Sequence, residues 1–231
     1  MSKVSALIPA YNEARTIAAT VAAVRRISAV DEIIVVDDGS SDSTVTLAQE
    51  AGADVVVTGE RNEGKGAALM KGMSSASGDI LLFLDADLGE SACHGIVLAQ
   101  AVISGETDMA IAILPTVQTS GGGRSGGLGL ALRLARWGIR LFTGRTMKAP
   151  LSGQRALRRE ILERVGKLDP GFGVEVGLTI DALRAGYRVE ESPAPMTHRA
   201  TGRDVHGFAH RARQFRDILM VLARRALRRS R

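Results

Sequence analysis

Asp79-Ile-Leu-Leu-Phe-Leu-Asp-Ala-Asp87 is the segment most informative about the architecture, because an apolar run ends there in two carboxylates separated by one residue. Residues 80–84 include no polar side chain, which predicts a central strand covered on both faces, as in a parallel sheet. Open α/β sheets bind ligands at the carboxyl ends of their strands. Asp85 and Asp87 would lie at that end, with oxygens suited to bridging magnesium or manganese to a diphosphate. The alternative is that they cap the following helix.

The rest of the first half alternates strands with helices, so we expect an α/β fold with a mostly parallel central sheet. A chain of 231 residues can bury a substantial core, and we expect one domain over 1–231. The helix after the first strand has Ile17, Val21, Val24 and Ile27 on one face. The expected strands are Val4 to Ile8, Glu32 to Asp37, Val55 to Val57, Ile80 to Leu84 and Asp108 to Leu114, with helices reaching about Ser28, Ala51 and Ala76 and one over Glu90 to Ser104.

The second half is less regular. Residues 121–129 include six glycines, which predicts no regular element and leaves an active-site lid or a surface linker as the two interpretations. Helices are expected over Leu130 to Thr143 and Gly173 to Ala185, a short strand or loop over Pro150 to Arg155, and an extended segment over Tyr187 to Met196. We therefore divide the domain into 1–115, 116–206 and 207–231.

Composition is that of an ordinary globular protein, with 45% apolar and 24% charged residues. No apolar run approaches the roughly 18 residues that cross a bilayer. The apolar part of residues 1–10 is too short for a secretory signal. Cys93 is the only cysteine, so an intrachain disulfide is excluded and a reducing cytoplasm is the expected setting.

Positive charge is concentrated at the carboxyl end. Residues 199–231 hold ten arginines and two aspartates, a net +8, so residues 1–198 carry −3 of the total +5. Phe208, Phe215, Leu219 and Leu222 recur at helical spacing, which predicts a basic amphipathic helix over 207–229. This helix either packs on the domain with a solvated arginine face or docks on the anionic inner face of a membrane. Nucleic acid is not expected as a partner, because few aromatic side chains are present to stack on bases.

Four motifs stand in order in the first half: Pro9-Ala-Tyr-Asn-Glu13, Val36-Asp-Asp-Gly-Ser-Ser-Asp42, Gly64-Lys-Gly66 and Leu84-Asp-Ala-Asp87. In this order they resemble the family-2 glycosyltransferases of the GT-A fold. The second half, through Pro150-Leu-Ser-Gly153, Gly173-Val-Glu-Val-Gly-Leu-Thr-Ile-Asp181 and Thr197-His-Arg199, is similar to glucosyl-3-phosphoglycerate synthases and polyprenyl-phosphate sugar transferases.

The resemblance implies a metal-dependent transferase that moves a hexose, glucose first, from UDP to a phosphorylated small acceptor such as 3-phosphoglycerate. A polyprenyl phosphate or another cell-envelope acceptor at the membrane surface is the alternative. Retaining and inverting stereochemistry both stay open, as does a homodimer.

The resemblance also implies how the nucleotide sugar is held. Asp38 would accept the imide N–H of uracil, although Asp37 and Asp38 as turn and cap residues are the alternative. Lys65, between two glycines that let the backbone approach closely, would meet a phosphate or the base. The full set implied for the donor is Pro9, Ala10, Tyr11, Glu13, Asp38, Gly64, Lys65, Asp85 and Ala86.

Catalysis and metal binding are implied in the same way. Asp87 would ligate Mn²⁺ or Mg²⁺ directly, and the match of Thr197-His-Arg199 implies His198 as a further ligand. Glu175 would be the general base on the acceptor hydroxyl of an inverting enzyme, or a contact to the sugar ring in a retaining one. Glu175 and Asp87 are thus the implied catalytic residues, and the acceptor side is formed by Arg124, Ser152 and Gly153.

Other classes of protein fit less well. After its first strand a nucleotidyltransferase would carry a glycine-rich basic loop, and a dinucleotide oxidoreductase would carry G-x-G-x-x-G; Ala10-Tyr-Asn-Glu13 is neither. A phospho-receiver domain would use Asp37 and Asp38 for magnesium but would leave the second half without a role. A sugar-nucleotide-binding protein without transfer activity would lack the acids that are present here.

Overall fold

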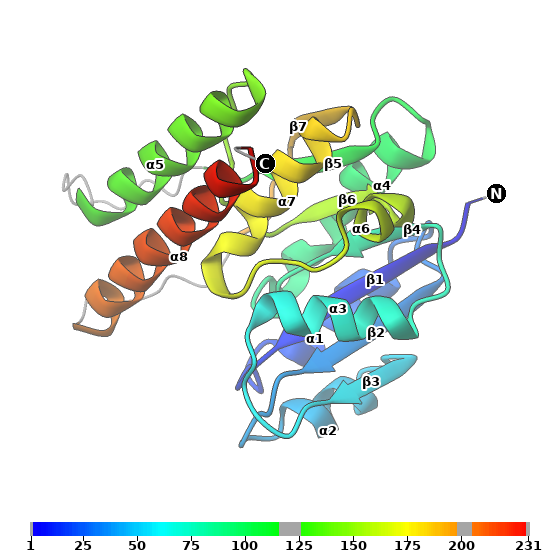
Figure 1. Cartoon of the computed structure of the whole chain (residues 1–231). Coiled ribbons are helices and arrows are strands. Elements are labelled where there is room, and N and C mark those ends of the chain that lie inside the picture. Colours follow the sequence, from blue (N-terminus) through cyan, green and yellow to red (C-terminus); the bar gives the residue numbers. More distant parts are fainter. Residues whose placement is uncertain (1, 116–125, 198–204, 230–231) are drawn as a thin grey trace.

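The computed structural model describes residues 2–115, 126–197 and 205–229. In that part of the chain, seven strands form one sheet in the order β3-β2-β1-β4-β6-β5-β7 (Figure 1). Strand β6 is antiparallel to β4 and β5, and the other neighbours are parallel, which confirms the prediction of a mostly parallel sheet. The strands are β1 Val4–Ala10, β2 Glu32–Asp37, β3 Val55–Thr58, β4 Ile80–Phe83, β5 Met109–Ile113, β6 Arg155–Arg158 and β7 Val189–Pro193.

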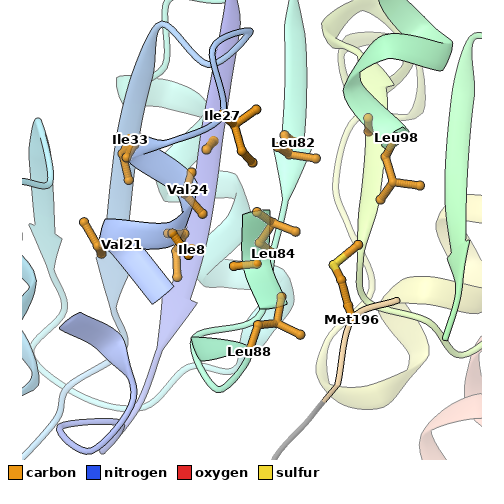
Figure 2. Packing of buried hydrophobic residues seen from close by; sticks show 14 of the residues in the cluster. Ile8, Val21, Val24, Ile27, Ile33, Leu82, Leu84, Leu88, Leu98 and Met196 are labelled. Carbon is orange, nitrogen blue, oxygen red and sulfur yellow. The ribbon is translucent and has the colours of Figure 1, made fainter. Parts of the chain in front are cut away.

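Helices cover both faces of the sheet, because alternate residues of each central strand are apolar on opposite faces. In Figure 2, Val21 and Val24 of α1 pack over Ile8 and Ile33, so the predicted apolar face of this helix is confirmed. One face carries α1 Ile17–Arg25, α2 Thr44–Glu50, the 3₁₀ helix η1 Gly89–Gly95 and α4 Ile96–Ile103. The other carries α3 Lys65–Ser75, α5 Gly126–Thr143, α6 Arg159–Val165, α7 Val174–Arg184 and α8 Val205–Arg229.

Two helices in the middle of the chain differ from the prediction. The single helix expected over 90–104 is divided into η1 and α4, which join at Gly95, where a Cβ would lie 3.3 Å from Leu84. The last part of the glycine-rich stretch is helical, because α5 begins at Gly126 and tolerates its glycines at about 1 kcal/mol each while burying Ala131 and Ile139. Residues 116–125, where the lid was expected, lie outside the described residues.

Around β6 the prediction was weakest. The segment expected as a strand or loop over 150–155 is a loop that enters the strand only at Arg155, and α6 was not predicted. Strand β6 has four residues and an arginine at each end, so its sequence gives little strand signal. Helix α7, preceded by the 3₁₀ turn η2 Gly171–Gly173, agrees with the expected helix over 173–185.

Helix α8 is confirmed, but its predicted apolar face is buried only in part. Leu222 is buried as predicted, whereas Phe215 and Leu219 are exposed, and the other buried residues in the described part of the helix are Asp217, Ile218, Val221 and Arg225. The side chain of Phe208 lies outside the described part. Glycines explain the difference, since a Cβ on Gly171 would lie 2.3 Å from Asp217, one on Gly173 2.3 Å from Val221, and one on Gly177 2.8 Å from Arg225. Three residues spaced four apart on α8 therefore pack directly on η2 and the start of α7.

The predicted solvated face of arginines is wrong for Arg225. Its side chain is 5% exposed, and its guanidinium lies 2.6 Å from Asp169 and 2.5 Å from Asp181. This buried ion group fastens α8 to the loop before η2 and to α7. No helix within the described ranges is long and apolar enough to cross a membrane.

We expect Arg225→Ala to lower the free energy of unfolding by roughly 3 kcal/mol, because it leaves two largely buried carboxylates without their shared cation. Arg213→Ala, at an exposed position of the same helix, is the matched control and should change stability by less than about 0.5 kcal/mol. Urea denaturation of both variants gives the comparison. Equal losses in the two would contradict a structural role for the buried ion group.

Candidate active site

A hollow of about 160 Å³ lies at the carboxyl ends of β1, β2 and β4. The chain proceeds from β1 to β2 on one side and returns to β4 on the other, so this edge is a topological switch point, where open α/β sheets bind ligands. Of the nine residues predicted to hold the donor, seven line the hollow, and Glu13 and Ala86 are not among the lining residues. The lining comprises Pro9, Ala10, Tyr11, Asp38, Asn62, Gly64, Lys65, Ala68 and Asp85.

Glu13 and Ala86 make local contacts instead. The Glu13 carboxylate accepts a hydrogen bond from the Thr16 hydroxyl at 3.1 Å, at the start of α1. The carbonyl of Ala86 accepts one from Thr20 at 2.8 Å, and its side chain is buried. Both residues shape loops beside the hollow.

Asp38 organises the loop that closes the hollow. Its carboxylate accepts the backbone N–H groups of Glu63 at 2.9 Å and Gly64 at 2.6 Å. Gly64 has φ +90°, a conformation that favours glycine, and α3 begins directly after it. Asp37 is different, because it accepts the N–H groups of Gly39 and Ser40 within its own turn. The turn alternative therefore holds for Asp37, while Asp38 joins two loops.

Asn12 belongs to the motif Pro9 to Glu13 and is not among the lining residues, but it joins two loops beside the hollow, a role that the sequence analysis did not predict. It is the one non-glycine residue with positive φ, +55°, among the described residues, and asparagine tolerates this conformation better than most side chains. Its side-chain oxygen accepts the N–H of Ser41 at 2.9 Å, and its own N–H donates to the Ser40 hydroxyl at 2.8 Å. The loops after β1 and β2 are thereby joined, and an asparagine in a turn motif was the available signal.

Lys65 stands between two acids at the inner end of the hollow. Its ammonium lies 2.5 Å from Asp85 Oδ1 and 3.2 Å from Glu175 Oε1. Burial opposes the charge of this ammonium, but attraction from Asp85 and Glu175 outweighs burial and raises the pKa of Lys65 above its ordinary value. The structure thus brings together three predicted residues from α3, the end of β4 and α7.

Gln154 and Gly153 complete this centre. The Gln154 amide donates to Asp85 Oδ2 at 2.8 Å and accepts the backbone N–H of Asp85 at 3.0 Å, which fixes the carboxylate. A Cβ on Gly153 would lie 2.2 Å from the Lys65 ammonium and 2.9 Å from Asp85 Oδ2. The backbone of residue 153 therefore forms one wall of the site. Gln154 was missed, because a polar residue in a presumed loop gives no sign that it is fully buried.

The other acceptor-side predictions have mixed outcomes. Ser152 is half-buried, and its Oγ is buried without a hydrogen-bond partner in the described part of the chain. Arg155, which was not predicted as a site residue, is buried beneath this loop and donates to the carbonyls of Ser152 and Glu175. Arg124 lies outside the described residues.

Asp87 follows Asp85 by two residues and is half-buried at the end of β4. Within the described ranges no group of three or more histidine, cysteine or acidic side chains converges. Mg²⁺ and Mn²⁺ fit this setting nevertheless, because such ions are often bound by one or two carboxylates together with phosphate and water. The family resemblance implies the carboxylate of Asp87 as the direct ligand, and Asp85 is held by Lys65 and Gln154. His198 lies outside the described residues.

A larger hollow, of about 700 Å³, lies beside α3, the loop 167–170 and α8. None of the predicted site residues lines it. Its charged side chains include Glu63, which pairs with Lys71, and Asp169, which pairs with Arg224 and Arg225. The smaller hollow is lined by seven of the residues predicted to hold the donor, so we take it as the candidate active site.

Comparison with known proteins shows the family of this chain. The family described as "Glycosyl transferase family 2" matches residues 5–166. A glucosyl-3-phosphoglycerate synthase of Mycobacterium tuberculosis is 33% identical over 202 residues, which are 78% of this chain and 60% of the relative. An undecaprenyl-phosphate 4-deoxy-4-formamido-L-arabinose transferase of Pectobacterium carotovorum is 43% identical over 97 residues, 38% of this chain and 30% of the relative. The chain thus spans about 60% of the length of the curated synthase that it matches.

Solved structures give a longer match. The crystal structure of the Mycobacterium tuberculosis glucosyl-3-phosphoglycerate synthase with Mn²⁺, UDP-glucose and phosphoglyceric acid has a TM-score of 0.77 and 29% identity. The match covers 96% of this chain and 80% of that one. The same protein with Mg²⁺ and UDP gives a TM-score of 0.78 at 30% identity.

We expect Gly153→Ala to weaken binding of UDP with Mn²⁺ by roughly tenfold, because the added Cβ displaces the flexible end of Lys65 from Asp85. The free energy of unfolding should change little. Gly129→Ala, where a Cβ meets nothing within 4 Å, is the matched control and should bind as the wild type does. Isothermal calorimetry measures both, and an unchanged affinity in Gly153→Ala would remove residue 153 from the site.

Proposed function

The chain belongs to glycosyl transferase family 2, and from this premise we propose that it transfers a hexose, glucose first, from UDP to a phosphorylated small acceptor such as 3-phosphoglycerate. One observation carries the proposal: the hollow at the carboxyl ends of β1, β2 and β4 is lined by a cation, Lys65, that is shared by two acids from different halves of the chain. A mycobacterial relative of similar fold, solved with UDP-glucose and phosphoglyceric acid, supports the same substrates.

The donor would enter with its base in the hollow. Tyr11 is 47% exposed at the rim, where its ring can stack on a base, and Asp38 can accept the imide N–H of uracil with lone pairs beyond those used by the loop. Gly64 has no side chain to block the approach of the ribose. The diphosphate then points toward Lys65, whose ammonium is already held at the inner end.

The diphosphate is also the leaving group, so its growing negative charge must be stabilised. Asp87, with His198, would hold Mn²⁺ or Mg²⁺, and the bound ion supplies that stabilisation. Lys65 contributes a second positive charge from the protein itself. Asp85, fixed by Gln154, is left to orient the sugar hydroxyls through its carboxylate.

Glu175 and the backbone of residue 153 both lie beside the ammonium of Lys65, so the sugar would lie next to α7 and residue 153. In an inverting transfer Glu175 takes the proton of the acceptor hydroxyl; in a retaining transfer it holds the sugar ring. Ser152, whose hydroxyl has no protein partner in the described residues, and Arg124 would bind the acceptor phosphate. Presence of Asp85, Asp87 and Glu175 argues against a binding protein without transfer activity.

The test is a panel of radiolabelled nucleotide sugars, with 3-phosphoglycerate or a polyprenyl phosphate as acceptor, with and without Mn²⁺. We expect transfer from UDP-glucose to the phosphoglycerate, loss of transfer in EDTA, and a fall of at least about 10³-fold in Asp87→Asn, because the leaving diphosphate loses its counter-charge.

Glu90→Gln is the matched control, since this acid lies three residues from Asp87 on an exposed position and should transfer normally. Full activity of Asp87→Asn, or of the wild type in EDTA, would contradict metal-dependent transfer. If the enzyme transfers the sugar to the polyprenyl phosphate and not to 3-phosphoglycerate, the proposed acceptor is wrong and the lipid-linked acceptor takes its place.

A second candidate role is docking on an anionic membrane at its cytoplasmic face, and the paired helices α5 and α8 favour it. The two lie side by side (Figure 1), and Gly138 brings them together, because a Cβ there would lie 2.4 Å from Leu222. Beside this contact both helices expose apolar side chains: Leu130, Trp137 and Leu141 on α5, and Phe215, Leu219 and Met220 on α8.

The charge of this α5–α8 face helps to decide whether a membrane or a second copy of the chain binds there. Exposed arginines accompany the apolar residues on both helices, at Arg133, Arg136 and Arg140 and at Arg213, Arg216 and Arg224. An anionic bilayer complements them, each arginine near the surface being worth about 1 kcal/mol. A homodimer through the same face would oppose like charges, so a membrane is the better partner and a lipid-linked acceptor gains with it.

Trp137 is the only tryptophan in the chain and is 58% exposed, so its fluorescence reports on this face. We expect anionic vesicles at low salt to shift its emission to shorter wavelength, and high salt to reverse the shift through screening. Neutral vesicles should have no effect. Arg133→Glu should weaken the shift, whereas Arg164→Glu on α6 should not. A shift that depends on protein concentration without vesicles would instead indicate a homodimer.

A further inference from the structure

We propose that Arg155 is a positioning residue for the transfer reaction, which ties the acceptor-side loop 150–153 to the first turn of α7 and so sets Gly153 opposite Glu175. This inference rests on the proposed function. Arg155 begins β6, where it pairs with Phe83 of β4 and Ile111 of β5, and its side chain is 1% exposed. It therefore reaches the site from inside the protein.

The guanidinium binds two segments at once. Its Nε donates to the Ser152 carbonyl at 2.9 Å and its Nη2 to the Pro150 carbonyl at 3.4 Å. Its Nη1 donates to the Glu175 carbonyl at 3.0 Å and to the Thr179 hydroxyl at 2.8 Å. The guanidinium group is planar, and its N–H donors point in fixed directions. These bonds therefore fix the position of the loop relative to α7.

The partners of Arg155 are neutral. Among the described residues no carboxylate forms an ion pair with it, and the nearby acid Glu175 pairs with Lys65 instead. Burial lowers the pKa of Arg155 to about 10, against attraction from Glu175, Glu191 and Asp85. A buried cation without a counter-ion is costly for stability, and such costs concentrate at functional sites.

Glu175 is consequently held from two sides. Its carbonyl accepts from Arg155 and from Thr179, at 3.0 and 2.8 Å, while its carboxylate lies 3.2 Å from Lys65. Gly153, two residues before Arg155, faces the same ammonium. Loss of the fork would let the loop and Glu175 move apart, and a displacement of about 1 Å at reacting groups can cost roughly 100-fold in rate.

Arg159 provides a matched control, because it has the same structural task away from the site. It donates to the carbonyls of Gly78, Met73 and Ala76 at 2.7, 3.3 and 2.6 Å. Arg155→Met and Arg159→Met each remove one carbonyl-binding guanidinium next to β6. A purely structural role for Arg155 predicts that the two variants behave alike once activity is corrected for the folded fraction.

We expect Arg155→Met to lower kcat by roughly 100-fold with less than about threefold change in KM for the donor, and Arg159→Met to leave both within about threefold. In a Glu175→Gln background Arg155→Met should cost less than about threefold, because both changes act on one unit. Arg155→Lys keeps the charge but can bind only one of the two segments at a time, so its kcat should lie between those of the wild type and Arg155→Met. This variant provides the test if Arg155→Met does not fold.

Hydrogen exchange separates this inference from the proposed function. Arg155→Met should lose amide protection in residues 150–153 and 175–179, and Arg159→Met should not. If the wild type transfers no sugar in the donor panel, the proposed function fails, and exchange alone decides whether Arg155 joins the two segments. Equal kcat in the two methionine variants, or unchanged protection in Arg155→Met, would overturn the proposal.

Discussion

The shared ammonium of Lys65 is the interaction on which the rest of the site depends. Asp85 comes from the first half of the chain and Glu175 from the second, and both carboxylates contact the same ammonium. Without this cation the two negative charges would repel each other. Lys65 itself is placed by the left-handed Gly64, which Asp38 fixes through two backbone hydrogen bonds. The loop fixed by Asp38, the carboxylate of Asp85 and the carboxylate of Glu175 are thus coupled through Lys65, so a change in one of them alters the electrostatic environment of the others.

The sheet explains how two distant halves reach one lysine. Strand β6 runs antiparallel between β4 and β5, so the residues just before it, Gly153 and Gln154, emerge at the edge where the parallel strands β1 and β4 end. A parallel strand in that place would have put its beginning, and the loop before it, at the opposite edge. The reversed direction of one four-residue strand therefore places the backbone of residue 153 beside Lys65 of the first half.

Most of the first half could be predicted from the sequence, because long apolar runs and turn motifs report directly on local structure. The acid-tipped strand, the amphipathic α1 and seven donor-side residues of the hollow follow from such patterns and from the family resemblance. Gln154, Arg155 and Arg225 could not be found in this way. They are buried polar side chains, and their burial depends on partners from elsewhere in the chain; a local pattern presents them as exposed. The same limit explains why Phe215 was assigned to the buried face of α8 and Val221 was not.

Helix α8 packs on the domain and also exposes a basic surface, two properties that the sequence analysis treated as belonging to alternative interpretations. Its inner face places Asp217, Val221 and Arg225 on Gly171, Gly173 and Gly177, which flank Glu175 at the start of α7. Its outer face, with α5, carries exposed apolar side chains among arginines. Because these glycines have no side chains, α8 contacts the backbone of η2 and α7 directly. A ligand that displaced α8 by binding its outer face would therefore also displace the backbone around Glu175. Binding at the outer face of this helix would consequently also affect the position of Glu175.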